Sequence, residues 1–187
     1  MPLNEPYGLP HQSLNDRKYS LTRYPRGVPS APARLDAANA DFIQSGLAID
    51  AASFEAGRVP VLARAIACRV APDRESITVF FSASTNRRFL DAVAASRAIA
   101  VVFCHPATLQ TLQLKGVDAV VAAGSADDDA HVAAAVDAFV DKVVPLGFAA
   151  SLARGELHVP PGALRAITFT ISAAFVQTPG PTAGARM

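Results

Sequence analysis

The chain has 187 residues, of which 51% are hydrophobic and 18% charged, and its formal net charge is +1. This length and hydrophobic content are typical of one soluble globular domain and exclude a disordered chain. The near-neutral charge excludes a general nucleic-acid surface, which requires a basic stripe. No apolar run is long enough to span a membrane and no secretory leader pattern is present, so the sequence predicts a cytoplasmic protein without a membrane partner.

The first 34 residues are rich in proline and show no apolar periodicity. This composition predicts an extended N-terminal arm over 1–34, followed by a single domain over 35–187. At the start of that domain, Asp36 or Asn39 is expected to cap a short helix that runs through Phe42.

The rest of the chain is dominated by strand patterns. Apolar alternation predicts six strands, at 46–53, 61–71, 77–83, 98–106, 108–124 and 164–178. Strand 61–71 is expected to form a hairpin with 77–83, and 98–106 to pair with 108–124, where Gly116 indicates a bend. Helices are predicted at 85–97 and 125–147. Strands that follow one another so closely favour a mainly β fold, an antiparallel barrel with short helices.

Several catalytic motifs are absent from the sequence, including G-x-S-x-G, H-E-x-x-H, the P-loop and G-x-G-x-x-G. The four histidines share no ligand spacing, so no metal site is expected. Cys68 and Cys104 lie in apolar strand patterns and are expected to be reduced and buried. The acidic run 127–129 is interpreted as helix capping because it lies where a helix start favours negative charge.

Two adjacent arginines, Arg87 and Arg88, lie at the start of the predicted helix 85–97. A helix start carries partial positive charge, so cations there oppose ordinary helix design. A bound phosphate would reverse this, because helix N–H groups, guanidinium groups and nearby hydroxyls can all donate to its oxygens. The alternative is that both arginines point into water. The polar residues that could join them are Ser82, Ser84, Thr85 and Asn86.

Two more arginines interrupt the apolar strand 61–71. A cation in mid-strand needs either solvent or an anion. Strand alternation places Arg64 and Arg69 on opposite faces, so both can reach one ligand only if the strand bends.

The order of three segments resembles the pyridoxamine 5′-phosphate oxidase family. These segments are PVLARAIACR, VFFSASTNRR and IAVVFCHPATLQTLQLKG. The resemblance covers about residues 42–124, and AAFVQTPGP (173–181) is in keeping with it. It implies a split β-barrel of the type that binds flavin mononucleotide (FMN), with the flavin at a homodimer interface.

The resemblance also implies roles for individual residues. Arg64 and Arg69 match basic residues on the phosphate side of the flavin, Ser82 matches a small hydroxyl residue, and Arg87 and Arg88 match the pair that grips the phosphate. Gln110 and Thr111 match polar groups near the flavin ring, often from the second subunit. Gln113 and Lys115 are candidates further along that strand, with plain solvent-facing positions as the alternative.

The chain departs from the vitamin B6 oxidases proper, which end in a segment with Trp and Arg, whereas this chain has no Trp and ends in QTPGPTAGARM. The expected function is therefore that of a flavin-dependent oxidoreductase acting on an unknown small substrate, with catalytic residues unassigned. One alternative is a flavin-binding carrier or sensor without turnover. Another is a barrel interaction module without a cofactor, whose arginines meet an acidic partner.

Overall fold

The structure is a computed structural model and describes residues 32–187. Most of the predicted arm therefore lies outside the described residues. The last two residues of that arm contact the barrel: the N–H of Ala33 donates to the carbonyl of Ile171, and Arg34 Nε donates to the carbonyl of Asp73.

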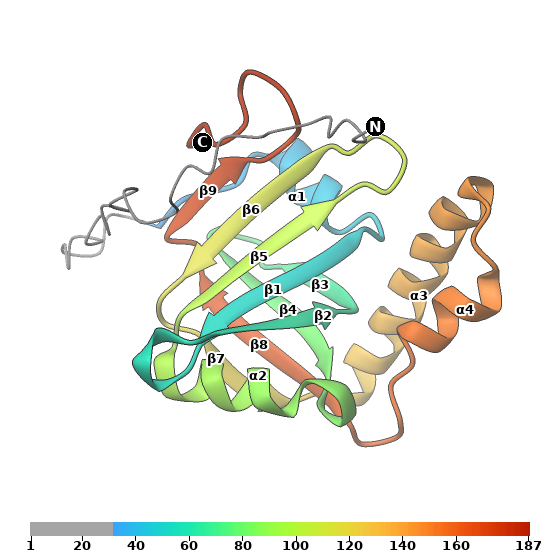
Figure 1. Ribbon diagram of the computed structural model, residues 1–187, viewed down its shortest axis with the longest axis horizontal. Helices are drawn as coiled ribbons and strands as arrows, with labels where there is room; N and C mark the ends of the chain where they lie inside the picture. The colour runs from blue at the N-terminus through green and yellow to red at the C-terminus, as the bar shows by residue number, and fades with distance from the viewer. Residues whose placement is uncertain (1–31) are drawn as a thin grey trace, which may run out of the picture.

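The described residues form nine strands, four α-helices and two short 3₁₀ helices (Figure 1). In chain order they are α1 (Ala37–Ile43), β1 (Ala48–Phe54), η1 (Ala56–Arg58), β2 (Pro60–Ala65), β3 (Ala67–Val70), β4 (Ser76–Ser82), α2 (Ala83–Ser96), β5 (Ile99–Cys104), β6 (Thr111–Gly116), β7 (Val120–Ala123), α3 (Ala126–Val143), η2 (Val144–Leu146), α4 (Ala150–Glu156), β8 (Leu164–Thr170) and β9 (Ala173–Val176).

The strands form two sheets that enclose the main core. Sheet A has the order β2-β1-β5-β6-β9 and sheet B the order β3-β4-β8-β7, and every strand pair is antiparallel. Fully buried side chains such as Phe81, Phe103, Leu114 and Phe169 fill the space between the sheets. The fold class predicted from the sequence, an antiparallel split β-barrel with short helices, is confirmed.

Three of the predicted strands are each two strands in the structure, which is why there are more than the six expected. The chain passes from sheet A to sheet B at Ile66, between β2 and β3, and again after Gly116, between β6 and β7. It returns to sheet A between β8 and β9. The predicted hairpin of 61–71 with 77–83 is therefore right only for β3, because β2 pairs with β1 instead.

The predicted helix starts are confirmed at α1 and α3. The Asp36 carboxylate accepts a hydrogen bond from the N–H of Asn39 at 2.7 Å. At α3 the Ser125 hydroxyl accepts from the N–H of Asp128, whose carboxylate accepts from the N–H of Ser125 in return. This capping box satisfies two N–H groups that a helix start leaves without intrahelical partners.

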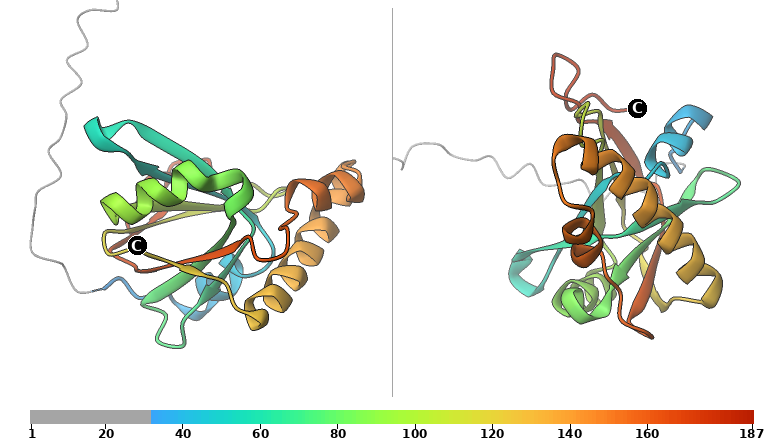
Figure 2. Two further views of the ribbon diagram at one scale, coloured as in Figure 1. Left: turned by 90° about the horizontal axis from the view of Figure 1, so that it is seen from below. Right: turned by 90° about the vertical axis from the view of Figure 1, so that its right-hand side faces the viewer.

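Helices α3 and α4 form a hairpin that packs against the outer face of sheet B, as the two views of Figure 2 show. A second core lies there, with Phe80 and Leu164 from the sheet facing Phe139, Val140 and Leu157 from the hairpin. Apart from this core, the Lys142 ammonium donates to the carbonyl of Ser45 and ties α3 to the loop before β1. Among the described residues no helix is long and apolar enough to cross a membrane.

The close packing of α3 against the barrel depends on Gly46. This residue has φ +77°, and a Cβ built on it would lie 2.6 Å from the Cβ of Ala138 in α3. Real Cβ atoms do not approach this closely, so the helix backbone reaches the barrel only because Gly46 has no side chain.

We expect Gly46→Ala to lower the free energy of unfolding by roughly 2–4 kcal/mol, from backbone strain and the displacement of α3 together. The matched control is Gly57→Ala, since Gly57 has φ +73° but no described atom within 4 Å of its built Cβ. The control is expected to cost only about 1 kcal/mol of strain. Urea unfolding measures both, and equal losses would contradict the steric explanation.

Candidate functional site

The start of α2 lacks a capping side chain. Ser82 stands at the N-cap position, but its hydroxyl is 2.7 Å from the Ser84 hydroxyl and caps no backbone N–H in the described structure. The first turn contains no acidic residue, and the helix is kinked at Asn86, with φ −121° and ψ 22°. The N–H groups of this turn therefore present partial positive charge without a carboxylate to offset it.

Asn86 connects this helix start to β2. Its Nδ2 donates to the carbonyl of Ser82 at 3.1 Å and lies 3.4 Å from the carbonyl of Arg64. The backbone at Arg64 is thus held beside the first turn of α2. The strand β2 at Arg64 and the start of α2 are therefore neighbours in the fold, although they are separated in sequence. The family resemblance assigned both to one flavin phosphate.

The two adjacent arginines have different surroundings. Arg88 forms a bidentate ion pair with Glu55, with Nε–Oε1 and Nη2–Oε2 distances of 2.8 and 2.7 Å. The hydrogen bonds from Arg88 are the main reason that the pKa of the Glu55 carboxyl is lowered. Arg87 is exposed, and its guanidinium makes no hydrogen bond or ion pair with any residue that the structure describes. Arg87 is therefore the guanidinium that is available to a ligand at the start of α2.

Arg64 lies on the outer face of β2, directly opposite Asp50 of β1. Its Nη1 is 3.3 Å from an Asp50 oxygen, its Nε is 3.9 Å from Glu156 Oε1, and its guanidinium carbon lies 5.5 Å from the centre of the Phe139 ring. The Nε atom is buried and has no hydrogen-bond partner among the described residues. The guanidinium is turned toward the α3–α4 hairpin.

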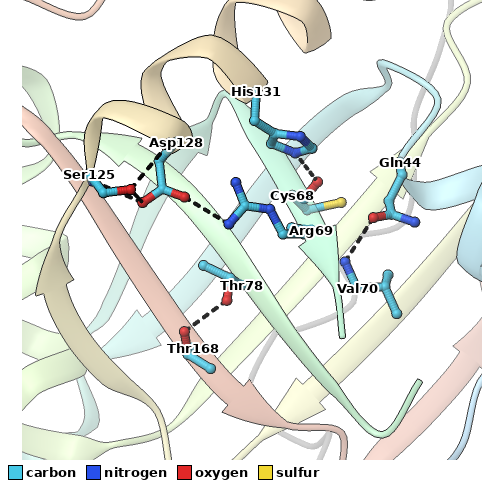
Figure 3. Close-up of polar contacts among 9 residues, drawn as sticks. All are labelled: Gln44, Cys68, Arg69, Val70, Thr78, Ser125, Asp128, His131 and Thr168. Carbon is cyan, nitrogen blue, oxygen red and sulfur yellow. Dashed lines mark hydrogen bonds and ion pairs between the residues drawn. The ribbon is translucent and has the colours of Figure 1, made fainter. Parts of the chain in front are cut away.

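Arg69 lies in the other sheet and contacts the start of α3 (Figure 3). Its Nη1 is 2.8 Å from Asp128 Oδ1, and its guanidinium lies over the Phe80 ring at 5.3 Å. Beside it, His131 Nε2 is 2.8 Å from the carbonyl of Cys68. The bend that the sequence required for a shared ligand does occur at Ile66, but it brings Arg69 against the capping box of α3 and not toward the start of α2.

The candidates on β6 lie on the outer face of sheet A. Gln113 is opposite Val102 of β5 and Phe175 of β9, and the Lys115 ammonium lies 5.0 Å from the centre of the Phe175 ring. Thr111 is buried and donates its hydroxyl hydrogen bond to the carbonyl of Leu109. Gln110 is exposed in the loop that precedes the strand.

Small and apolar side chains surround these polar groups on the same face. Ala52, Ala100, Val102 and Cys104 are half-buried, and Figure 1 looks onto this face with no described helix in front of it. Across sheet A, Arg64 and Gln113 occupy the same row, separated by three strand spacings or about 14 Å. No helix of residues 32–187 covers this largely apolar face, which has a cation near each side and the Asp50 carboxylate beside Arg64.

Neither cysteine is in a disulfide within the described residues. Cys68 is fully buried, as expected, and donates to the carbonyl of Ile43 at 3.1 Å. Burial raises the pKa of the Cys68 thiol, so it stays protonated and unreactive. Cys104 is only half-buried. Among the described residues, no three His, Cys, Asp or Glu side chains gather in a group that could hold a metal ion.

The sequence alone did not reveal the acidic partners of the arginines. Asp50 lies in β1, Glu55 directly after it and Glu156 in α4, and no spacing rule connects them to Arg64 or Arg88. One signal could have indicated a partner for Arg64. The alternation of β1 places Asp50 on a solvent-facing position next to apolar neighbours.

No family model matches this chain, and neither does any curated protein. Among solved structures, HupZ of Group A Streptococcus is similar, with 14% identity, a TM-score of 0.47, and 80% of this chain and 100% of that chain covered. An F420 reductase has 14% identity, a TM-score of 0.46 and coverage of 72% and 93%. A Clostridium acetobutylicum protein of the pyridoxinephosphate oxidase family, related to general stress protein 26 of B. subtilis, has 12% identity, a TM-score of 0.45 and coverage of 73% and 83%. The family that the sequence resembles is thus represented among the similar structures.

The capping box of α3 should make stability depend on pH. Hydrogen bonds from the backbone and hydroxyl of Ser125 and from Arg69 outweigh partial burial and lower the pKa of the Asp128 carboxyl. A carboxyl with a lowered folded-state pKa contributes stability that is fully present above its unfolded pKa and lost as the pH falls through the folded value.

We therefore expect Asp128→Asn to lower the free energy of unfolding by roughly 1–2 kcal/mol at pH 7. The difference from the unchanged protein should begin to shrink as the pH falls below about 4, where the unfolded state takes up a proton. It should be lost once the pH falls through the lowered folded-state pKa, where the Asp128 carboxyl is protonated in both states. Denaturant unfolding at several pH values tests this, with Asp127→Asn, outside the capping box, as the control. A difference that does not change with pH would contradict the explanation.

Proposed function

We propose that this chain is an FMN-binding protein that acts as a flavin-dependent oxidoreductase on a small substrate. The observation that carries the proposal is the start of α2, an uncapped helix terminus without acidic residues, beside Arg87, which has no partner among the described residues. Helix N–H groups and a guanidinium are the donors that a phosphate ester requires. The sequence resemblance assigns a flavin phosphate to the same residues.

The residues at this site fit the phosphate in complementary ways. Arg87 supplies a full positive charge, and the hydroxyls of Ser84 and Thr85 supply further donors next to the first-turn N–H groups. Ser82 acts through its hydrogen bond to the Ser84 hydroxyl. Arg88 positions α2 by pairing with Glu55. Arg87 is then the arginine of the two that contacts the phosphate.

The outer face of sheet A is the proposed site of the flavin ring and of the second subunit. Thr111, Gln113 and Lys115 offer hydrogen-bonding groups and a cation on this face, and a cation near the ring favours the reduced, anionic flavin. When bound, the flavin supplies the electron transfer, and the protein residues orient it. An uncovered apolar sheet face is best buried against a second copy of the chain, which would close the ring between two subunits.

The phosphate assignment predicts unequal effects of the two arginines. We expect Arg87→Ala to weaken FMN binding about tenfold or more, because a hydrogen bond to a charged group is worth roughly 1.5–3 kcal/mol. Arg88→Ala should change FMN affinity less while lowering the thermal unfolding midpoint, because it removes the contact between α2 and Glu55.

Titration of each variant with FMN, followed by flavin fluorescence, measures these affinities. Retention of FMN by the protein but no reduction by NADH or NADPH would favour a carrier or sensor over an enzyme. If neither the unchanged protein nor the variants bind FMN, the proposal is wrong and an interaction module without cofactor is favoured.

The dimer assignment predicts that a charge on the outer face of sheet A separates the subunits. We expect Val102→Asp to convert a dimer into a monomer, since it places an unpaired carboxylate at the centre of the buried face. Val117→Asp, at a valine that is 67% exposed outside both sheets, should leave the dimer intact. Sedimentation velocity measures both, and a monomeric unchanged protein at micromolar concentration would contradict the assignment.

A further inference from the structure

A cavity of about 340 Å³ lies between the edge of sheet A and the α3–α4 hairpin. Its walls are formed mainly by apolar side chains, among them Phe139 of α3, Leu146 of η2, Phe148 of the following loop and Leu152 of α4. Two ionisable residues line it, Arg64 and Glu156. Small-molecule sites in proteins are mostly apolar concavities with a few polar groups that fix orientation, and this volume is at the small end of their range.

The exposed apolar side chains of the hairpin gather at this cavity. Leu146, Phe148 and Leu152 are 44%, 56% and 65% exposed. Single exposed apolar residues are common on protein surfaces, but three large ones around one cavity form a patch that favours an apolar occupant. A larger hollow of about 660 Å³ beyond α4 is less suited to a ligand, because its guanidinium, Arg154, is already paired with Asp137.

The polar requirement of the cavity is set by Arg64. Its Nε–H is buried without a hydrogen-bond partner among the described residues, and Glu156 at 3.9 Å is beyond hydrogen-bond distance. A buried donor without an acceptor is costly, and an acceptor atom on a ligand removes that cost. The Arg64 Nε–H therefore favours a ligand that places an oxygen or nitrogen acceptor at this wall of the cavity.

The charges around Arg64 determine what kind of acceptor fits. Asp50 and Glu156 both flank the single guanidinium, so the three groups together already carry an excess of negative charge. A further anion would be repelled by the two carboxylates, and a cation, although the carboxylates attract it, would offer no acceptor to the Arg64 Nε–H. A neutral acceptor such as a carbonyl oxygen meets neither difficulty.

We propose that this cavity binds a small, neutral, apolar carbonyl compound, whose oxygen accepts a hydrogen bond from Arg64 Nε and whose hydrocarbon body contacts Phe139, Phe148 and Leu152. The identification of this compound class as the substrate rests on the proposed flavin-dependent function. The binding itself does not, because the proposed phosphate site uses Arg87, which has no partner within residues 32–187, and does not use Arg64.

The test uses an acetyl(dimethylamino)naphthalene, a neutral aromatic ketone whose fluorescence responds when it leaves water. It is titrated into the purified protein, with and without added FMN, next to the matched carboxylate, in which the acetyl group is replaced by a carboxyl group. We expect the ketone to bind at least tenfold more tightly than the carboxylate. Equal binding, or tighter binding of the carboxylate, would overturn the proposal.

Two variants locate the site. Leu152→Asp, at an exposed position that does not affect the core, should weaken ketone binding at least tenfold, whereas Val117→Asp should leave it unchanged. Glu156→Gln should leave ketone binding within about twofold and tighten carboxylate binding, because it removes one of the repelling charges. If Leu152→Asp has no effect, the ketone binds elsewhere and the proposal fails.

The outcome is separable from that of the proposed function, because FMN retention is read from flavin absorbance in the same samples. Ketone binding without FMN retention would support the cavity and contradict the flavin assignment. FMN retention without ketone binding would support the flavin assignment and contradict the proposed ligand of the cavity.

Discussion

The passage of the chain from one sheet to the other at Ile66 is the constraint on which the rest of this structure depends. Sheets A and B enclose the main core, and the chain first passes between them here, because β2 and β3 are consecutive and belong to different sheets. The same crossing places Arg64 at the edge of sheet A and Arg69 in sheet B, both beneath the α3–α4 hairpin but far apart along α3. One arginine is thereby available to a ligand, and the other holds the start of a helix.

The region around α2 shows how charge is distributed between structure and binding. Glu55 neutralises Arg88 and Asp128 neutralises Arg69, so these two cations serve the fold. Arg87 has no such partner among residues 32–187, and Arg64 has weak partners and a buried free donor. Groups whose interactions are incomplete within the protein are the ones that a ligand can complete, and the two arginines mark the two proposed sites, one for the phosphate and one for the carbonyl compound.

Much of this could be predicted from the sequence, for identifiable physical reasons. Apolar alternation located the strands, and the Ser125 to Asp129 segment indicated the start of α3, because both signals are local. The change of sheet at Ile66 could not be predicted, since residues on both sides of it face the same core and the apolar pattern continues through it. At Gly116 the sequence indicated a bend, but not that the chain passes into the other sheet there. The pairing of Arg88 with Glu55 was equally hidden, because it joins side chains 33 residues apart that only tertiary structure brings together.

The pairing of β4 with β8 has a consequence for the order in which the two sheets form. Thr78 and Thr168 share a hydrogen bond across this pair although 90 residues separate them, whereas in sheet A the pairs β1–β2 and β5–β6 each join consecutive strands of that sheet. Closing so long a loop is entropically costly, and non-local pairing is slow. During synthesis, most of sheet A can therefore assemble while β4 still lacks β8. Sheet B is completed only after the α3–α4 hairpin and β8 have emerged, and β9 then joins the edge of sheet A.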